Sequence, residues 1–352
     1  MPQPFAIYTV GGAVRDALLG LPVKDRDYVV VGADPEQLQA LGYQSVGKDF
    51  PVFLHPDTHE EYALARTERK TAPGYAGFAF HAAADVTLEQ DLMRRDLTIN
   101  AIAMDEQGNL IDPYGGQADI QNKIFRHVSK AYAEDPVRIL RLARFAARFP
   151  DFSIASETMQ LMQTMVQAGE VDALVPERVW QELSRGLMEK KPSRLFQVLQ
   201  ECGALQKILP ELAALNTVQY TSSSQLEKNL YSIALQVVDE AAQHNASLAI
   251  RFALLLCDAE MLNGHSDVAS TTTKLSSLNT TFVEAACARL KIQNEVRDVV
   301  IMFARESSNL RHANTFSAEM LVKLFERCDA FRRPERFGEL LIAMQYQNLV
   351  QT

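Results

Sequence analysis

The sequence has few cysteines and no long apolar run. Its four cysteines, Cys202, Cys257, Cys287 and Cys328, form no Cys-x-x-Cys pair, which argues against a zinc finger or a disulfide framework and favours a reducing cytoplasm. No stretch approaches the roughly 20 consecutive apolar residues that a membrane-spanning helix needs. The first residues, MPQPFAIYTVGG, include no lysine or arginine and pass directly into a strand-like segment. We therefore expect a cytoplasmic protein with neither a signal peptide nor a membrane partner.

Positive charge is scarce overall but locally concentrated. The chain of 352 residues has a formal net charge of −9, which taken alone argues against a polyanionic partner. Residues 121–148 nevertheless hold seven basic residues against two acidic ones, a net charge of +5. A basic strip on an acidic protein can bind phosphates selectively while the rest of the surface repels them.

Hydrophobic periodicity divides the chain into two kinds of region. The length and an apolar content of 47% suit two or three domains. Short strand-like and helix-like segments alternate through residues 1–125, whereas segments such as PVRILRLARFAARF at 136–149 follow a helical period. The sequence predicts an α+β fold, with a mixed-sheet head at 1–125, an all-helical neck and body at 126–212 and a helical tail at 213–352.

Two closely spaced carboxylates end the segment GGAVRDALLGLPVKDRD at 11–27. Asp25 and Asp27 are separated by one residue and lead into YVVV, an apolar segment typical of a strand. Because alternate residues of a strand share a face, we expect both carboxylates to project from the same side. Mg²⁺ binds one or two carboxylates together with phosphate oxygens, so this pair is a candidate metal site. An exposed loop ahead of a strand is the plainer alternative.

A pair of glycines opens the same segment. Gly11 and Gly12 stand between a predicted strand and a predicted helix, where the missing side chains let the backbone approach an anion. Arg15 follows one turn later and can bind a phosphate through its guanidinium group. A simple turn is the usual role of two glycines, but the turn, the arginine and the Asp-x-Asp strand together favour a nucleotide phosphate site.

A helix rich in arginine is predicted after Glu134. Asp135 precedes a proline and suits a helix start. At about 100° per residue, Arg138, Arg141, Arg144 and Arg148 fall within one arc of this helix. A solvated surface is the ordinary interpretation of such an arc.

The same helix start also offers a means of base recognition. Cytosine and adenine both carry an amino group beside a ring-nitrogen acceptor, whereas uracil and guanine have a carbonyl oxygen in place of that amino group. A carboxylate at Asp135 accepting from the amino group, with Arg138 donating to the acceptors, would select C and A together.

Residues 11–27 resemble the first motif of the class II tRNA nucleotidyltransferase and poly(A) polymerase family, through Gly-Gly-x-Val-Arg-Asp, Leu-Leu-Gly and Asp-x-Asp. Ordered matches cover roughly residues 8–210. Four further segments continue the resemblance in the family's order: RRDLTIN at 94–100, the flexible-loop region DPYGGQAD at 112–119, the base-selecting EDPVRILRLARF at 134–145 and the neck segment PERVWQEL at 176–183.

The resemblance implies a polymerase-β-like head and a specific activity, the template-independent addition and repair of the CCA end of tRNA. CTP and ATP would be the substrates, pyrophosphate the product, and Mg²⁺, held by Asp25 and Asp27, the cofactor. Asp135 and Arg138 would select the base. With the residues argued above, the expected nucleotide-binding set is Gly12, Arg15, Arg95, Asp96, Asp135, Arg138, Arg141 and Arg144.

Two assignments within this set leave alternatives open. Arg95 matches a nucleotide contact of the family, and Asp96 and Asn100 could reach the ribose hydroxyls, although a salt bridge at a helix start is the plainer role. Glu61 aligns with a third catalytic carboxylate that some members use near the attacking 3′-hydroxyl. Glu60 beside it is an equal candidate.

The tail departs from the family pattern. Some relatives carry a metal-dependent phosphohydrolase domain named for a His-Asp doublet, and RFALLLCDAE at 251–260 is similar to the segment that holds it. Here Cys257-Asp258 replaces the doublet, and Asn229 stands where an upstream histidine is expected. Because metal ligation needs a complete set of donors, we expect a degenerate helical tail without phosphohydrolase activity. Its role in holding tRNA or in dimerisation, and the oligomeric state, are left open.

Two other functions compete with CCA addition. A poly(A) polymerase, or an enzyme that adds only CC or only A, would keep the fold. Poly(A)-making relatives often have a basic tail, whereas this chain ends in the uncharged QYQNLVQT. The intact DPYGGQAD argues against an enzyme that adds only CC. An RNA-binding protein with a decayed active site would be expected to lack Asp25, Asp27 or one of the arginines. All of them are present.

Overall fold

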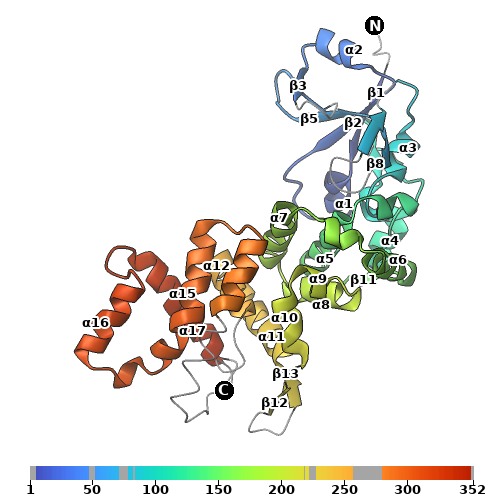
Figure 1. Cartoon of the computed structure of the whole chain (residues 1–352). Coiled ribbons are helices and arrows are strands. Elements are labelled where there is room, and N and C mark those ends of the chain that lie inside the picture. The colour runs from blue at the N-terminus through green and yellow to red at the C-terminus, as the bar shows by residue number, and fades with distance from the viewer. Residues whose placement is uncertain are drawn as a thin grey trace. The chain divides into compact units, whose positions relative to one another are not determined.

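The computed structural model forms two compact units, one of residues 1–138 and 151–173 and the other of residues 139–150 and 174–352. The predicted boundaries at 125 and 212 stay predictions. No helix in the described part of the chain combines the length and apolar character that crossing a membrane requires. The structure describes residues 5–46, 52–70, 78–81, 84–217, 219–221, 227–256 and 280–349 (Figure 1).

The first unit is built on a seven-stranded mixed sheet with the strand order β3-β4-β5-β2-β1-β8-β9. Strands β2 and β5 pair in parallel, and the other neighbours in this sheet pair antiparallel. This arrangement confirms the predicted mixed-sheet head. The strands are β1 (Ala6–Val10), β2 (Asp27–Val31), β3 (Gln44–Val46), β4 (Val52–Leu54), β5 (Glu61–Leu64), β8 (Ala103–Met104) and β9 (Leu110–Ile111).

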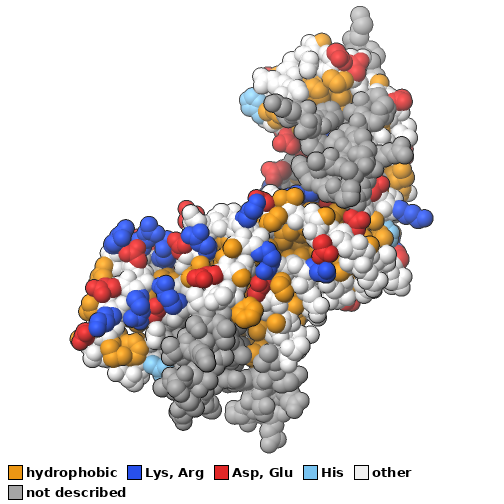
Figure 2. Space-filling model, viewed as in Figure 1, with side chains coloured by type: hydrophobic (Ala, Val, Ile, Leu, Met, Phe, Trp, Pro, Cys, Tyr) orange, Lys and Arg blue, Asp and Glu red, His pale blue; other side chains and the backbone are white. Residues whose placement is uncertain are grey.

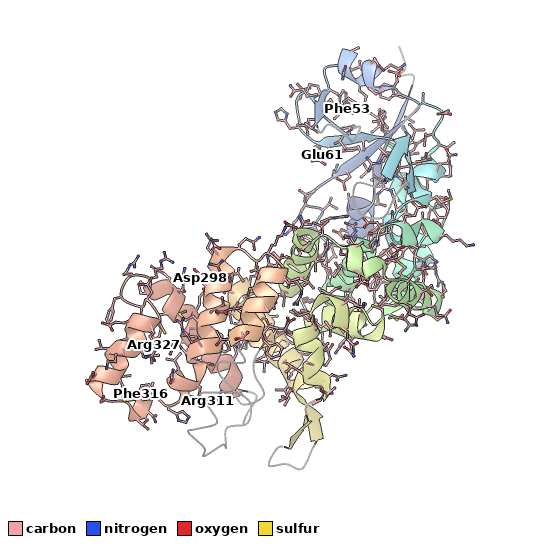
Figure 3. The ribbon with its side chains drawn as sticks, viewed as in Figure 1. Phe53, Glu61, Asp298, Arg311, Phe316 and Arg327 are labelled. Atoms are coloured by element: carbon pink, nitrogen blue, oxygen red, sulfur yellow. The ribbon has the colours of Figure 1, made fainter. Side chains whose placement is uncertain are left out.

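Both faces of this sheet carry a hydrophobic core. Val30 packs in a cluster with Phe53 (labelled in Figure 3) and Leu64, whereas its neighbour Val29 packs in a second cluster with Leu92. Neighbouring strand residues point to opposite faces, so the continuous YVVV run of β2 supplies both clusters.

Short helices with polar caps connect and cover the strands. The side chain of Asp34 caps α2 and that of Thr87 caps α3, each in a reciprocal bond with a glutamine three residues later. The remaining elements of the unit are α1 (Gly12–Leu18), α2 (Pro35–Ala40), α3 (Leu88–Met93), α4 (Gly116–Asn122), α6 (Ser156–Gln167), the 3-10 helices η1 (Thr98–Asn100), η2 (Lys130–Glu134) and η3 (Glu170–Ala173), and the strand pairs β6 (Thr67–Lys70) with β7 (Phe78–His81) and β10 (Ile124–Phe125) with β11 (Ser153–Ile154).

The second unit is mostly helical, as predicted. Helix α5 (Val137–Arg148) belongs to it from Ile139 onward. The expectation of an all-helical chain beyond 126 is wrong in detail, because β11 and the pair β12 (Gln219–Thr221) and β13 (Glu227–Asn229) form backbone ladders there. The helices are α7 (Pro176–Leu187), α8 (Ser193–Glu201), α9 (Leu205–Ile208), α10 (Pro210–Ala214), α11 (Leu230–Gln243), α12 (Leu248–Leu255), α15 (Asn294–Arg311), α16 (Ala318–Arg327) and α17 (Pro334–Leu349), with 3-10 turns η4 (Leu215–Thr217) and η5 (Ala313–Thr315).

Two tail residues singled out by the sequence have structural partners. Asn229 caps α11 by accepting from the backbone N–H of Ser232 at 2.8 Å. Arg251 is buried in α12 and donates to the carbonyl of Leu187 at 2.8 Å and that of Ala246 at 2.9 Å, at the ends of neighbouring helices. Cys257-Asp258 lies outside the described residues, so the absence of phosphohydrolase activity stays a prediction.

Charges on the C-terminal helices are interleaved rather than segregated. Figure 2 shows basic and acidic side chains side by side over this part of the second unit. Asp298 pairs with Arg297 at 2.9 Å and with Arg336 at 3.2 Å, and Glu306 pairs with Arg305 and Arg327, both at 3.0 Å.

Candidate nucleotide-binding site

The glycine turn lies against the RRDLTIN segment. Gly11 follows β1 with a φ of 69° and donates its N–H to the carbonyl of Ile102 at 3.2 Å. A Cβ atom on Gly11 would lie 2.9 Å from Nη1 of Arg95, closer than side chains tolerate. The turn therefore favours glycine through its positive φ, and an added Cβ would also push the guanidinium group of Arg95 aside.

Arg15 is joined to RRDLTIN by a buried network. The residue is only 3% exposed, and its Nε and Nη2 atoms donate to Oδ1 of Asp16 at 2.9 and 2.8 Å. Its Nη1 atom donates to Oδ1 of Asn100 at 2.5 Å, and Nδ2 of Asn100 donates to Oδ1 of Asp96 at 2.9 Å. Residues separated by 85 positions thus share one set of hydrogen bonds. The salt bridge that the sequence offered as the plainer role of the RRDLTIN residues is present at Arg95, which pairs with Asp91 at 3.1 Å.

Arg95 is held by a carboxylate that sequence reasoning missed. Its Nε and Nη2 atoms donate to Oδ2 of Asp91 at 3.4 and 3.1 Å, while Nη2 of Arg94 donates to Oδ1 of Asp91 at 2.7 Å. Burial alone would raise the pKa of Asp91, but the two guanidinium groups outweigh burial and lower it. The signal was available in the sequence, since Asp91 precedes Arg94 and Arg95 by three and four residues, the spacing of side-chain neighbours on a helix.

Asp27 and Glu61 face each other on neighbouring strands. They are paired in register at the starts of β2 and β5, and in a parallel ladder such residues project from the same face (Glu61 is labelled in Figure 3). The strand begins at Asp27, so the expectation that Asp25 shares the strand is wrong, and Asp25 lies two residues ahead of it. All three side chains are exposed, and within the described residues no hydrogen bond or ion pair engages their carboxylates.

Glu60 differs from Glu61 in having partners. Its Oε1 atom accepts from the hydroxyl of Tyr28 at 3.4 Å and its Oε2 atom from that of Thr58 at 3.1 Å. The geometry thus separates two candidates that the sequence left equal. Glu61 is the one that stands opposite Asp27.

The arginines of α5 are not a solvated stripe. Arg138 is 9% exposed and donates from Nη2 to the carbonyl of Arg94 at 2.6 Å and from Nη1 to that of Ala131 at 3.0 Å. Arg141, Arg144 and Arg148 are half-buried, so the ordinary surface interpretation of this arc is wrong.

Asp135 and Arg144 also have partners within the fold. Asp135 accepts from the backbone N–H of Val137 at 3.0 Å, as expected for a residue that starts a helix. Arg144 donates from Nε to Oε2 of Glu182 at 2.6 Å, which links α5 to the PERVWQEL segment in α7.

The segment 112–119 is partly helical and tightly held. Asp112 accepts from the N–H groups of Gly116 and Gln117 at 2.7 and 2.8 Å and so caps α4. A Cβ atom on Gly116 would lie within 2.2 Å of the carbonyl oxygen of Thr98. The expectation of a flexible loop is therefore wrong from Gly116 onward, because the cap and the close approach of α4 to η1 fix this backbone.

The exposed carboxylates suit a hard cation. Among the described residues there is no group of three or more His, Cys, Asp or Glu side chains placed to hold a metal. Magnesium commonly uses only one or two carboxylates and completes its shell with water and substrate phosphates. Asp27 with Glu61 or Asp25 would offer such a donor set, and no basic side chain among the described residues pairs with these carboxylates.

Comparison with known proteins identifies the family. The description "Poly A polymerase head domain" matches residues 7–126, and "Probable RNA and SrmB-binding site of polymerase A" matches residues 151–215. The Multifunctional CCA protein of Herminiimonas arsenicoxydans is 60% identical over 346 residues, which cover 96% of this chain and 82% of that relative. The chain belongs to the multifunctional CCA protein family. Its relative from Janthinobacterium sp. (strain Marseille) is 59% identical and is covered to 81% of its length.

Solved CCA-adding enzymes share the fold of this family member. The Bacillus stearothermophilus CCA-adding enzyme in complex with CTP matches 99% of the chain and 77% of its own length, with a TM-score of 0.60 and 23% identity. The Thermotoga maritima CCA-adding enzyme complexed with tRNA matches 97% of the chain and 74% of its own length, with a TM-score of 0.61 and 22% identity. These likenesses confirm the predicted combination of a mixed-sheet head and a mostly helical remainder.

Proposed function

We propose that this chain adds and repairs the 3′-terminal CCA of tRNA, using CTP and ATP in a metal-dependent reaction in the cytoplasm. The observation that carries the proposal is the 60% identity, over nearly the whole chain, to a Multifunctional CCA protein. The fold shared with CCA-adding enzymes in complex with CTP and with tRNA supports the same substrates.

The reaction joins the 3′-hydroxyl oxygen of tRNA to the α-phosphorus of the nucleotide. The bond from that phosphorus to the β-phosphate oxygen breaks, and pyrophosphate leaves with the electron pair. Asp25 and Asp27 would hold Mg²⁺, which when bound neutralises developing charge on the phosphates. Glu61, opposite Asp27 and without a partner among the described residues, would accept the proton of the attacking hydroxyl.

The turn at Gly11 and Gly12 and the guanidinium of Arg95 would bind the triphosphate. Arg95 retains 18% exposure of its side chain and lies against the turn, so it can reach a ligand bound there. Arg15 is buried and its guanidinium group is fixed by Asn100, so it would attract the triphosphate through its positive charge without direct contact. Asp96, bonded to the same Asn100, would contact the ribose.

Base selection would fall to Asp135 and Arg138, with Arg141 and Arg144 as further nucleotide contacts. Arg138 donates to the backbone carbonyls of Arg94, Arg95 and Ala131, which hold its guanidinium group in place. A guanidinium group has five N–H donors, so these three bonds leave donors of Arg138 uncommitted among the described residues, and these would serve the base.

Extension of a tRNA transcript that lacks its last three nucleotides tests the proposal. With Mg²⁺, CTP and ATP, we expect addition of CCA followed by a stop, and replacement of Asp27 by Asn should lower the rate by at least about 100-fold. Addition of CC alone, of A alone or of a long A tract would instead indicate the alternative activities of the family. No extension by the wild-type chain would refute the proposal.

A further inference from the structure

We propose that Asp91 is a positioning residue that holds Arg95 against the glycine turn and thereby builds the triphosphate site. The inference rests on the proposed function, since it assigns to Arg95 the phosphates of the nucleotide. Asp91 itself is fully buried in α3 and cannot meet a substrate. Its effect must pass through the side chains that it binds.

The carboxylate of Asp91 divides its two oxygens between different partners. Oδ2 accepts from Nε and Nη2 of Arg95. Oδ1 accepts from Arg94 and, at 3.3 Å, from the backbone N–H of Arg66. Arg66 lies two residues after the end of β5 (Glu61–Leu64), the strand that begins with Glu61. One buried carboxylate therefore ties the end of the carboxylate-bearing strand to the arginine that faces the turn.

The opposite side of Arg95 is fixed by the backbone. Its Nη1 atom donates to the carbonyl of Asn100 at 3.5 Å and lies 2.9 Å from the place where a Cβ of Gly11 would be. A guanidinium group has five N–H donors, so these bonds leave donors on both Nη atoms uncommitted among the described residues. Those donors lie beside the turn at Gly11 and Gly12, where no side chain covers the backbone, so a phosphate bound at the turn could accept from them.

The dipeptide Arg94-Arg95 also contacts Arg138, one of the two residues proposed to select the base. Nη2 of Arg138 donates to the carbonyl of Arg94 at 2.6 Å, and Nη1 lies 3.5 Å from the carbonyl of Arg95. Asp91 binds the side chains of this dipeptide while Arg138 binds its backbone. Loss of the carboxylate would release Arg95 and leave two guanidinium groups without their shared anion.

The inference predicts a phosphate-specific defect in Asp91→Asn. An amide has one oxygen acceptor in place of two and no charge, so it cannot hold both arginines. We expect inorganic triphosphate, titrated calorimetrically into the full chain, to bind at least about tenfold more weakly. The KM values for CTP and ATP should rise by the same factor, because Arg95 would contact phosphate and not base.

A double-mutant cycle separates positioning from general destabilisation. If Asp91 acts through Arg95, Asp91→Asn should add no more than about twofold to the KM of Arg95→Gln, whereas independent effects would multiply. Glu306→Gln is the matched control, since Glu306 is 1% exposed in the second unit and also accepts from two arginines. It should lower the melting temperature without changing triphosphate affinity.

Each outcome of these measurements decides the inference. Triphosphate affinity of Asp91→Asn within twofold of wild type, or multiplicative effects in the cycle, would overturn it. If Asp91→Asn alone unfolds, Asp91→Asn with Arg94→Gln removes one of the two guanidinium groups that had shared the carboxylate, and the same binding test is applied to this double variant. Failure of the wild-type chain to extend tRNA counts against the proposed function, whereas wild-type extension with an unaffected Asp91 variant counts against the positioning role alone.

Discussion

Arg144 and Glu182 form a 2.6 Å ion pair in which the two side chains are only 12% and 6% exposed. The pair joins α5, the helix of the base-selecting motif, to α7, the helix of the neck motif. A charge left without its partner at such a site costs far more than one on the surface, because water cannot replace the missing ion.

Replacement of Glu182 by Ala should therefore lower the free energy of unfolding by about 3 kcal/mol. Trp180 is the single tryptophan of the sequence, lies buried on the same helix and reports urea unfolding of this unit by fluorescence. Glu177→Ala is the control. Glu177 lies on the same helix as Glu182 and pairs with Lys291, but both side chains of that pair are more than half exposed. Equal losses for the two variants would contradict the structural role of Glu182.

Glu61 and Glu60 should differ sharply in their effect on catalysis. Glu61→Gln removes the carboxylate opposite Asp27 and should lower kcat by at least about 100-fold. Glu60→Gln alters only the bonds to Tyr28 and Thr58 and should leave kcat within about threefold of wild type. Single-turnover addition of one C to a truncated tRNA measures both variants. The reverse order of effects would assign the third carboxylate to Glu60.

Replacement of Gly11 by Ala tests the contact between the glycine turn and Arg95. Gly20 is the matched control, since its φ of 67° resembles the 69° of Gly11 but nothing lies within 4 Å of its added Cβ. Both variants should lose about 1–2 kcal/mol of stability from the left-handed backbone. The Gly11 variant alone should raise the nucleotide KM, because its Cβ displaces the guanidinium group. A similar KM for both would argue against a functional role for the contact.

The stability of the first unit should depend on the charge of His127. Burial, and secondarily the positive charge of Arg126, lower the pKa of His127, which bonds through Nδ1 to the hydroxyl of Thr158. A lowered folded-state pKa means that the unfolded chain takes up the proton first, so this contribution is complete above the ordinary pKa of about 6.5 and is lost as pH falls below it. Circular dichroism melts between pH 7.5 and 5 should show a shallower decline for His127→Gln. Parallel declines would contradict the assignment.

The sequence alone determined those features of the protein that depend on short stretches of the chain, namely helices, strands and motifs. The helix that follows Asp135, the strand that leads on from Asp27 and the order of the five motifs are local patterns, and they sufficed for the fold class and the family. Local spacing even contained the partner of Arg95, since Asp91 stands four residues before it, although that signal was overlooked.

Only the tertiary structure decided which of these residues meet. The parallel register between β2 and β5 sets Glu61, and not Glu60, opposite Asp27 across 34 positions of sequence. The burial of Arg138 against the carbonyl of Arg94 and the close approach of Gly116 to the carbonyl of Thr98 likewise depend on other segments of the chain. Such choices are made by hydrogen bonds and close packing between distant parts of the chain, and hydrophobic periodicity within one segment carries no information about them.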